Sequence, residues 1–202
     1  MKKCYIVGAG ELGFSPIPDE GDLVIAADGG YDHLISHGVR CDLLIGDLDS
    51  IHADACCVEI LRHPVRKDET DMFLALREGA ERGYTFFELL GGTGGREDHT
   101  MANYSLLLWA AKRGYRARLH SATMTAEVVC NGSITLLGDS GKSFSVFAFG
   151  SDAKGVSILG ASYEADGVTL DCDFPLGVSN SFTGNEVSVT VSDGAVLVMY
   201  ER

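Results

Sequence analysis

The sequence is short of positive charge. Its 202 residues include 16 Lys and Arg against 29 Asp and Glu, which gives a formal net charge of −13. Proteins that bind nucleic acids without regard to sequence, and proteins that dock on anionic lipid, draw much of their affinity from Lys and Arg. We therefore expect neither a nucleic acid nor a membrane as a partner.

Long apolar runs are also missing. No segment approaches the ~18 consecutive apolar residues that a membrane-spanning helix needs. After Met1-Lys2-Lys3 only Cys4–Val7 is apolar before Gly8, which is too short for the core of a signal peptide. A mean hydropathy of +0.10 and 46% hydrophobic residues exclude a disordered chain. We expect a soluble, cytoplasmic protein.

The cysteines lack the spacing of a zinc site or a disulfide framework. No C-x-x-C pair is present, and several cysteines lie within apolar, strand-like runs. The six cysteines are Cys4, Cys41, Cys56, Cys57, Cys130 and Cys172. Because both kinds of site need defined spacings, we expect buried, reduced thiols.

The first part of the chain alternates between two textures. Short apolar runs, typical of strands buried on both faces, lie at 5–7, 23–27, 43–45 and 86–90, and residues 116–120 can form one more strand. Segments of helical composition lie between or after them, at 31–37, 53–61, 71–82 and 100–113. This alternation predicts an N-terminal α/β domain with a largely parallel sheet over residues 1–124.

After about residue 124 the hydrophobic pattern alternates with period two. The clearest segments are 143–149, 167–172, 186–191 and 195–200, and turn residues separate them at 138–139, 150–152, 166–167 and 193–194. This texture predicts an all-β C-terminal domain, a sandwich or a barrel, over residues 125–202. Only Lys142, Lys154 and Arg202 are basic here, so we expect an anion to bind to the first domain.

Polar or glycine-rich segments follow four predicted strands of the first domain. They lie at 8–10, 28–30, 46–50 and 91–99. In open α/β sheets the ligand crevice lies outside the carboxyl ends of the strands. We therefore expect the four segments to converge on one site.

Two acidic segments suit a metal ion or a phosphate. Asp47 and Asp49 follow a predicted strand and point the same way if the chain is extended, as Mg²⁺ ligands would. The alternative is an acidic turn in which Asp49 caps a helix. Asp68 and Asp71 have the N-cap and N3 spacing of a capping box, while Lys67 beside that helix start could meet a phosphate.

The strongest local signal is the segment from Gly91 to Arg96. Four glycines in five residues let backbone N–H groups approach an oxyanion, and Arg96 adds a planar set of donors. A flexible linker is the alternative, but it gives no reason for the Arg96 and Asp98 that follow the glycines. The segment is not a Walker A loop, because no Gly-Lys-Ser/Thr follows.

A second glycine pattern favours a different function. Gly8, Gly10 and Gly13 match the G-x-G-x-x-G fingerprint of dinucleotide-binding proteins, and Asp28 follows at about the right distance. That fingerprint requires a helix that begins at the glycines, whereas Pro16 and Pro18 would interrupt it. An NAD-linked oxidoreductase is therefore kept only as an alternative.

Taken in order, these motifs resemble the thiamine pyrophosphokinase family. The matching pieces run through nearly the whole chain, at 27–30, 46–50, 67–71, 91–103 and 177–180, although the last alone is typical of a polar turn. The resemblance implies an α/β catalytic domain (1–124) followed by a β-sandwich domain for thiamine binding and dimerisation (125–202). It implies transfer of pyrophosphate from ATP to the hydroxyl of thiamine, with Mg²⁺, in a homodimer that binds thiamine between its subunits.

The resemblance also implies roles for individual residues. The metal would be held by Asp47, Asp49 and Asp71. The nucleotide or its metal would be bound by Asp28, Gly29, Lys67, Thr70, Gly94, Gly95 and Arg96. The reaction pocket would be lined by Asp98, His99 and Asn103, and thiamine would be reached from the partner's β-domain by Ser179 and Asn180. The residues expected to carry catalysis are Asp49, Asp71, Arg96 and Asp98.

A third function stays open beside the kinase and the oxidoreductase. A sensor of nucleotide or thiamine would keep the pocket without the chemistry, and it would bind without releasing AMP. The three candidate metal ligands weigh against it, because a sensor need not retain them.

Overall fold

The structure, a computed structural model, describes residues 1–46, 59–62 and 69–202. It divides into an N-terminal unit, residues 1–106 with 114–122, and a C-terminal unit, residues 107–113 with 123–202. Among the described helices, none has the length and apolar character needed to span a bilayer.

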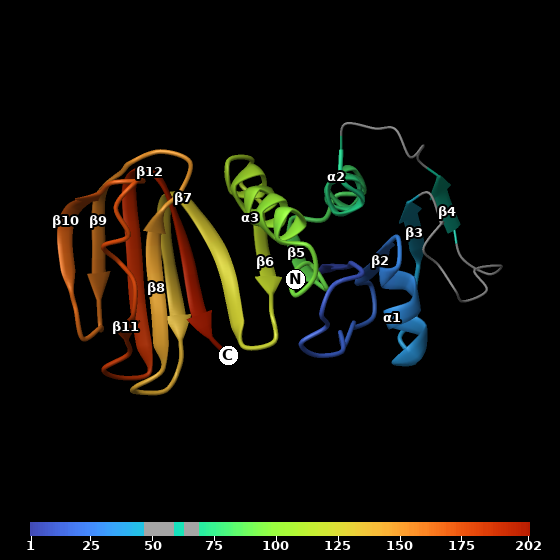
Figure 1. The fold of residues 1–202 in the computed structure, drawn as a ribbon, viewed down its shortest axis with the longest axis horizontal. Helices are drawn as coiled ribbons and strands as arrows, with labels where there is room; N and C mark the ends of the chain where they lie inside the picture. The colour runs from blue at the N-terminus through green and yellow to red at the C-terminus, as the bar shows by residue number, and fades with distance from the viewer. Residues whose placement is uncertain (47–58, 63–68) are drawn as a thin grey trace. The chain divides into compact units, whose positions relative to one another are not determined.

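The N-terminal unit is built on a parallel sheet (Figure 1). Its strands are β1 (Cys4–Val7), β2 (Leu23–Ala27), β3 (Leu43–Gly46), β4 (Glu59–Arg62), β5 (Phe86–Leu90) and β6 (Arg116–His120). They pair in the order β4-β3-β2-β1-β5-β6, and every pair is parallel. The chain moves outward from β1 to β4 and then returns to place β5 on the other side of β1. Such a reversal opens a crevice at the carboxyl ends of the two strands.

Helices cover both faces of this sheet. The described residues of this unit include the helices α1 (Gly30–Ser36), α2 (Asp71–Glu81) and α3 (Glu97–Ala111). Tyr31 and Leu34 of α1 pack into a cluster with Val7 and its neighbours on one face. Gly79 of α2 lies against Cys4, whose side chain points to the opposite face from its neighbour Tyr5. The strands are thus buried from both sides, as their continuous apolar runs predict.

Two helix predictions need correction. The helix expected over 53–61 is wrong at its described end, because Glu59–Arg62 forms strand β4 and pairs in parallel with β3. Ile60 lies opposite Leu44 in that pairing, so extension of the sheet overrides the local helical composition. Residues 53–58 lie outside the described residues. Helix α3 begins at Glu97 rather than at residue 100, and acidic side chains favour such a first turn.

The C-terminal unit is rich in strands and its strand pairs are antiparallel. The strands are β7 (Met124–Leu137), β8 (Ser143–Ala148), β9 (Ala153–Leu159), β10 (Ala165–Leu170), β11 (Asn180–Ser181) and β12 (Glu186–Glu201). Strand β12 pairs with β7 along its length, with β9 over its first half and with β8 over its second half. The strand-rich second half is thus as predicted, whereas the β-sandwich arrangement itself stays a prediction.

The turns expected at 166–167 and at 193–194 are wrong. Residues 166–167 lie within β10, whose register with β9 shifts between Ala165 and Val168. Residues 186–201 form one strand, and the register shifts between Val191 and Ala195. Gly194, with a φ of +99°, donates its N–H to the Asn131 side chain across the irregularity. A bulge therefore replaces the turn, which also explains why the two expected strands are continuous.

The described cysteines are free thiols, as expected. Cys4 is fully buried, Cys41 and Cys130 are half-buried, and Cys172 is exposed, against the expectation of burial for that residue. Burial raises the pKa of the Cys41 thiol to about 11, so the residue stays protonated at neutral pH. Cys56 and Cys57 lie outside the described residues.

Candidate active site

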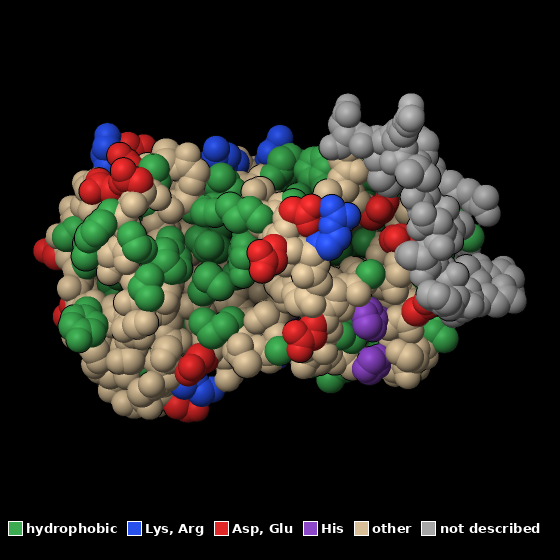
Figure 2. Space-filling model, in the orientation of Figure 1, with side chains coloured by type: hydrophobic (Ala, Val, Ile, Leu, Met, Phe, Trp, Pro, Cys, Tyr) green, Lys and Arg blue, Asp and Glu red, His purple; other side chains and the backbone are tan. Residues whose placement is uncertain are grey.

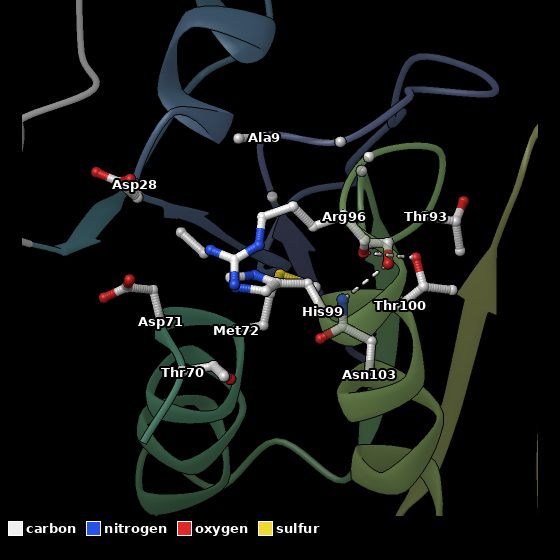
Figure 3. Close-up of a pocket in the computed structure, with 16 residues that line it drawn as sticks. Ala9, Asp28, Thr70, Asp71, Met72, Thr93, Arg96, His99, Thr100 and Asn103 are labelled. Carbon is white, nitrogen blue, oxygen red and sulfur yellow. Dashed lines mark hydrogen bonds between the residues drawn. The ribbon is translucent and has the colours of Figure 1, made fainter. Parts of the chain in front are cut away.

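A cavity of about 320 Å³ lies at the carboxyl ends of the parallel strands (Figure 3). All of its lining residues belong to the N-terminal unit. They come from the segments after β1 and β5, from the end of β2 and the residue after it, from the start of α2 and from the first two turns of α3. Among the predicted site residues, those that line it are Asp28, Thr70, Asp71, Gly95, Arg96, His99 and Asn103. Three of the four polar strand-end segments thus converge as expected.

The two glycine-rich loops after β1 and β5 line the site and lie side by side. The Gly8 N–H donates to the Leu90 carbonyl (2.8 Å), and the Gly10 N–H donates to the Gly91 carbonyl (2.8 Å). These bonds continue the β1–β5 pairing beyond the ends of both strands. A Cβ added to Gly10 would lie 2.4 Å from the Thr93 carbonyl oxygen, and one added to Gly91 would lie 2.2 Å from that of Gly8. Only glycine permits this approach.

This packing removes the basis for the dinucleotide-binding alternative. No helix begins anywhere in residues 8–22, so the first glycines do not open onto a helix N-terminus. Gly8 and Gly10 instead bring two backbone segments together. The NAD-linked oxidoreductase is therefore not supported by the structure.

Two side chains hold these loops from outside. His33 of α1 lies with Nε2 at 2.9 Å from the Gly10 carbonyl oxygen, to which the nitrogen must donate. Asn103 of α3 is buried and donates its amide N–H to the Gly92 carbonyl at 2.8 Å. His33 was not among the predicted site residues. Its signal was its place in a segment that directly follows the polar loop at 28–30.

Carboxylates gather on one side of the cavity. Figure 3 shows Asp28, which follows β2, and Asp71, which begins α2, with their carboxylates on the same side. Thr70 is the N-cap of α2, and its hydroxyl accepts the Phe73 N–H at 3.2 Å. The expected capping box is therefore displaced: Asp71 is the first helical residue instead of N3, and Asp68 lies outside the described residues. Asp71 lines the cavity from this first helical position.

Asp28 holds an unusual backbone conformation. Its φ is +50°, and among the described residues other than glycine only Asn131 and Ser179 share the left-handed region. Such a conformation costs energy and tends to persist where a function requires it. Two of these three residues, Asp28 and Ser179, were predicted to bind ligands on independent grounds.

A cationic group faces the carboxylates from the other side. Arg96 extends from the start of α3 into the cavity (Figure 3). Its guanidinium is paired with Asp98 through Nη2 to Oδ2 at 2.6 Å and Nε to Oδ1 at 3.1 Å. These hydrogen bonds lower the pKa of Asp98 and raise that of Arg96. The pair is therefore charged at neutral pH. The lining of the cavity includes Arg96 and His99 but not Asp98.

The start of α3 adds backbone donors to this side. Unpaired N–H groups of a first helical turn, together with the helix dipole, favour an anion. Gly95 lines the cavity just before this turn, while Gly94 is exposed in the same loop and Gly29 is the N-cap of α1. The site can therefore hold a polyanion between the Arg96 side and a cation bound by the carboxylates.

The predicted metal site is described only in part. Asp47, Asp49 and Lys67 lie outside the described residues, and no group of three potential ligands occurs within 1–46, 59–62 and 69–202. Asp28 and Asp71 nevertheless line the same cavity. Mg²⁺ is usually bound by one or two carboxylates together with substrate phosphates and water, so the residues present fit this ion.

The C-terminal residues predicted to bind thiamine behave differently from each other. Asn180 is buried, and its side chain donates to the Tyr163 carbonyl (2.7 Å) and accepts from the N–H groups of Tyr163 (3.0 Å) and Ser181 (2.9 Å). Ser179 is exposed, and its N–H donates to the Ser145 hydroxyl (3.1 Å). Asn180 thus links the segment at Tyr163 to β11 by hydrogen bonds, while Ser179 is exposed.

Comparison with known proteins gives consistent matches. Residues 15–119 match the family model described as thiamin pyrophosphokinase, catalytic domain, and residues 133–196 match the one described as thiamin pyrophosphokinase, vitamin B1 binding domain. The chain is 25% identical over 210 residues to the thiamine pyrophosphokinase of Bacillus subtilis (strain 168), and the match covers 98% of each chain.

Solved structures share the fold. The crystal structure of thiamine pyrophosphokinase from Bacillus subtilis superposes with a TM-score of 0.90 at 24% identity, covering 99% of both chains. That of thiamin pyrophosphokinase from Geobacillus thermodenitrificans gives a TM-score of 0.86 at 23% identity, covering 99% of this chain and 97% of the other. Thiamin pyrophosphokinase from Candida albicans gives 0.78 at 13% identity, covering 100% and 89%.

Proposed function

The chain belongs to the thiamin pyrophosphokinase family, and we infer that it transfers a pyrophosphoryl group from ATP to the hydroxyl of thiamine, yielding thiamine diphosphate and AMP. One observation in the structure supports this most directly. Asp28 and Asp71 line one side of a cavity whose other side carries Arg96, a glycine-rich loop and the start of a helix. This division suits a triphosphate that binds together with a divalent cation.

We propose that the polyphosphate lies between these two sides. Arg96 and the backbone N–H groups at the start of α3 would bind phosphate oxygens, because both are strong donors to oxyanions. Asp28 and Asp71 would hold Mg²⁺, with Asp47 and Asp49 as further predicted ligands and Lys67 and Thr70 beside them. When bound, Mg²⁺ would neutralise phosphate charge and orient the chain of phosphates.

The chemistry needs little covalent help from the protein. The thiamine hydroxyl oxygen forms a bond to the β-phosphorus, the bond from that phosphorus to the α-phosphate oxygen breaks, and AMP leaves. Positioning and charge stabilisation dominate catalysis of this class. Arg96 would stabilise the negative charge that moves onto the phosphate oxygens. His99 and Asn103 would shape the pocket, with Asn103 acting through the Gly92 carbonyl that it holds.

The remaining assignments concern the second substrate and assembly. We propose a catalytic, nucleotide-binding domain over 1–124 and a thiamine-binding β-sandwich domain over 125–202, in a cytoplasmic homodimer. Figure 2 shows hydrophobic side chains gathered on one face over the strands of the C-terminal unit. Several large hydrophobic side chains of this unit are exposed, among them Tyr163, Phe174, Leu176 and Val178. Ser179 of one chain would then contact thiamine bound by a second copy.

AMP formation tests the proposed function. Purified protein with ATP, thiamine and Mg²⁺ should release AMP and thiamine diphosphate in equal amounts. Omission of thiamine, or chelation of the metal with EDTA, should stop the reaction. Folded protein that binds ATP and thiamine but releases no AMP would instead be the nucleotide or thiamine sensor.

A further inference from the structure

Asp98 makes the contacts that a phosphate group would make. Its two carboxylate oxygens accept from Nε and Nη2 of Arg96, and Oδ1 also accepts the backbone N–H of His99 at 3.0 Å. One of these donors is the guanidinium that lines the cavity. The other is an N–H in the first turn of α3. Both belong to the donor set that suits an oxyanion at a helix N-terminus.

The position of Asp98 in the helix strengthens this resemblance to a bound anion. Asp98 lies in the first turn of α3, where the positive end of the helix dipole stabilises a negative group. A carboxylate and a phosphate both present two oxygens to the fork of a guanidinium. The side chain of Asp98 therefore satisfies, from within the chain, donors that the triphosphate also needs.

The pairing is exposed and therefore easily replaced. The side chains of Arg96 and Asp98 are 72% and 64% exposed, and ion pairs at such exposure contribute little to stability. A triphosphate carries more charge than one carboxylate and can bind several donors at once. Replacement of Asp98 by a phosphate as the partner of Arg96 is thus favourable. Because the ion pair must first be broken, however, the free energy gained when ATP binds is smaller.

We propose that Asp98 is an internal competitor of the nucleotide: it holds the Arg96 guanidinium and the His99 N–H, and ATP must displace it from both. Asp98 thereby lowers the affinity for ATP by a few-fold. This proposal rests on the proposed function only in taking ATP as the ligand.

The test is the affinity of Asp98→Asn for ATP. The amide keeps the size of the side chain but cannot form the ion pair, so ATP should bind roughly two- to fivefold more tightly. Binding is measured by isothermal titration calorimetry with ATP and Mg²⁺ and without thiamine. Unchanged or weaker binding would overturn the proposal.

A matched control separates this pairing from a general effect of charge. Glu97→Gln removes one negative charge from the adjacent exposed residue in the same turn, and it should change the dissociation constant by less than about 1.5-fold. An equal gain from both variants would show that only net charge matters, and would contradict the proposal.

Dependence on Arg96 supplies a second criterion. In an Arg96→Ala background, Asp98→Asn should shift the ATP dissociation constant no more than Glu97→Gln does. A gain that persists without Arg96 would refute competition for the guanidinium. Asp98→Ser serves if the asparagine variant folds poorly, as judged by circular dichroism.

These readouts are independent of turnover. If the protein releases no AMP but the Asp98→Asn gain is observed, the proposed reaction fails and the competition stands. If AMP is released at full rate by the wild type and no gain is observed, the competition fails and the reaction stands.

Discussion

The two units place their predicted site residues in opposite ways. In the N-terminal unit Asp28, Asp71 and Arg96 come from different elements and line one cavity. In the C-terminal unit two adjacent predicted residues have different environments. Asn180 is buried and hydrogen-bonded to backbone groups, whereas Ser179 is exposed. Position at the end of a strand or the start of a helix thus predicted which residues converge in the N-terminal unit. The thiamine contacts expected of Ser179 and Asn180 stay a prediction.

The geometry of the sheets explains the difference. All carboxyl ends of a parallel sheet lie at one edge, so polar residues that follow its strands converge whatever the details of each loop. Antiparallel neighbours run in opposite directions, and their turns fall at both ends of the sheet. The position of a polar turn between such strands therefore does not predict which residues its side chains will contact.

The first prediction tests the N-terminal side of this comparison. Asp71→Asn should lower the turnover number for AMP formation by roughly 10²- to 10³-fold, as removal of other charge-stabilising groups does. Glu81→Gln, at the exposed end of the same helix, is the control and should retain activity. Wild-type turnover in Asp71→Asn, with its fold verified, would remove Asp71 from the site.

The second prediction concerns the paired glycine loops. Gly10→Ala should lower the free energy of unfolding by about 1–3 kcal/mol, because the new methyl would meet backbone oxygens that cannot turn aside. ATP binding should weaken as well. Urea unfolding and calorimetry measure the two effects. Gly184→Ala in the C-terminal unit, where a Cβ meets nothing within 4 Å, should leave both unchanged.

The third prediction tests the C-terminal side. Asn180→Ala leaves the Tyr163 N–H and carbonyl and the Ser181 N–H without their partner, which should cost about 1–3 kcal/mol of unfolding free energy. The Michaelis constant for thiamine should rise, and ATP affinity should not change. Ser179→Ala is the matched variant: it should raise the same constant without loss of stability. If Asn180→Ala weakened ATP binding as strongly as Gly10→Ala does, the assignment of ATP binding to the N-terminal unit alone would be contradicted.

Much of the fold follows from local pattern. The strands at 23–27 and 86–90 begin and end where the apolar runs predict, because a strand buried on both faces needs a largely apolar sequence. The strand at 116–120 also has its predicted bounds, although it contains two arginines and is only partly buried. Strand β4 could not be predicted from the local pattern, because its extended form depends on pairing with β3. Strand β12 was divided in two, because a bulge and a turn have the same Asp-Gly signature.

The convergence of several site residues on one cavity could be predicted from the sequence, but their hydrogen bonds could not. Asp28, Asp71 and Arg96 could be chosen from residue type and position after a strand or before a helix. The N-cap at Thr70, the pairing of Arg96 with Asp98 and the burial of Asn180 could not, because each depends on where neighbouring backbone lies in space. His33 was missed for the same reason, since its partner is a carbonyl 23 residues away.

His33 offers the smallest expected effect and the finest test of how the N-terminal site is held together. Its Nε2 donates to the Gly10 carbonyl, so it ties the helix that follows Asp28 to the loop that packs on Gly91. Loss of one such bond is worth about 0.5–1.5 kcal/mol. His33→Phe should therefore raise the Michaelis constant for ATP by a few-fold, up to about tenfold, with little change in turnover number.

Rescue separates positioning from simple stability. His33→Gln can donate an amide N–H to the same carbonyl and should recover most of the ATP affinity, even if its melting temperature stays as low as that of His33→Phe. His37→Gln, at the exposed end of α1, is the control for changes in the helix itself. Affinity that follows melting temperature across all three variants would make His33 a residue of the fold alone. ATP affinity that follows the presence of a donor at residue 33 would show that α1, which holds no predicted site residue, helps to position the glycine loops. Such support from a neighbouring helix would then be part of what brings the site residues of the N-terminal unit together.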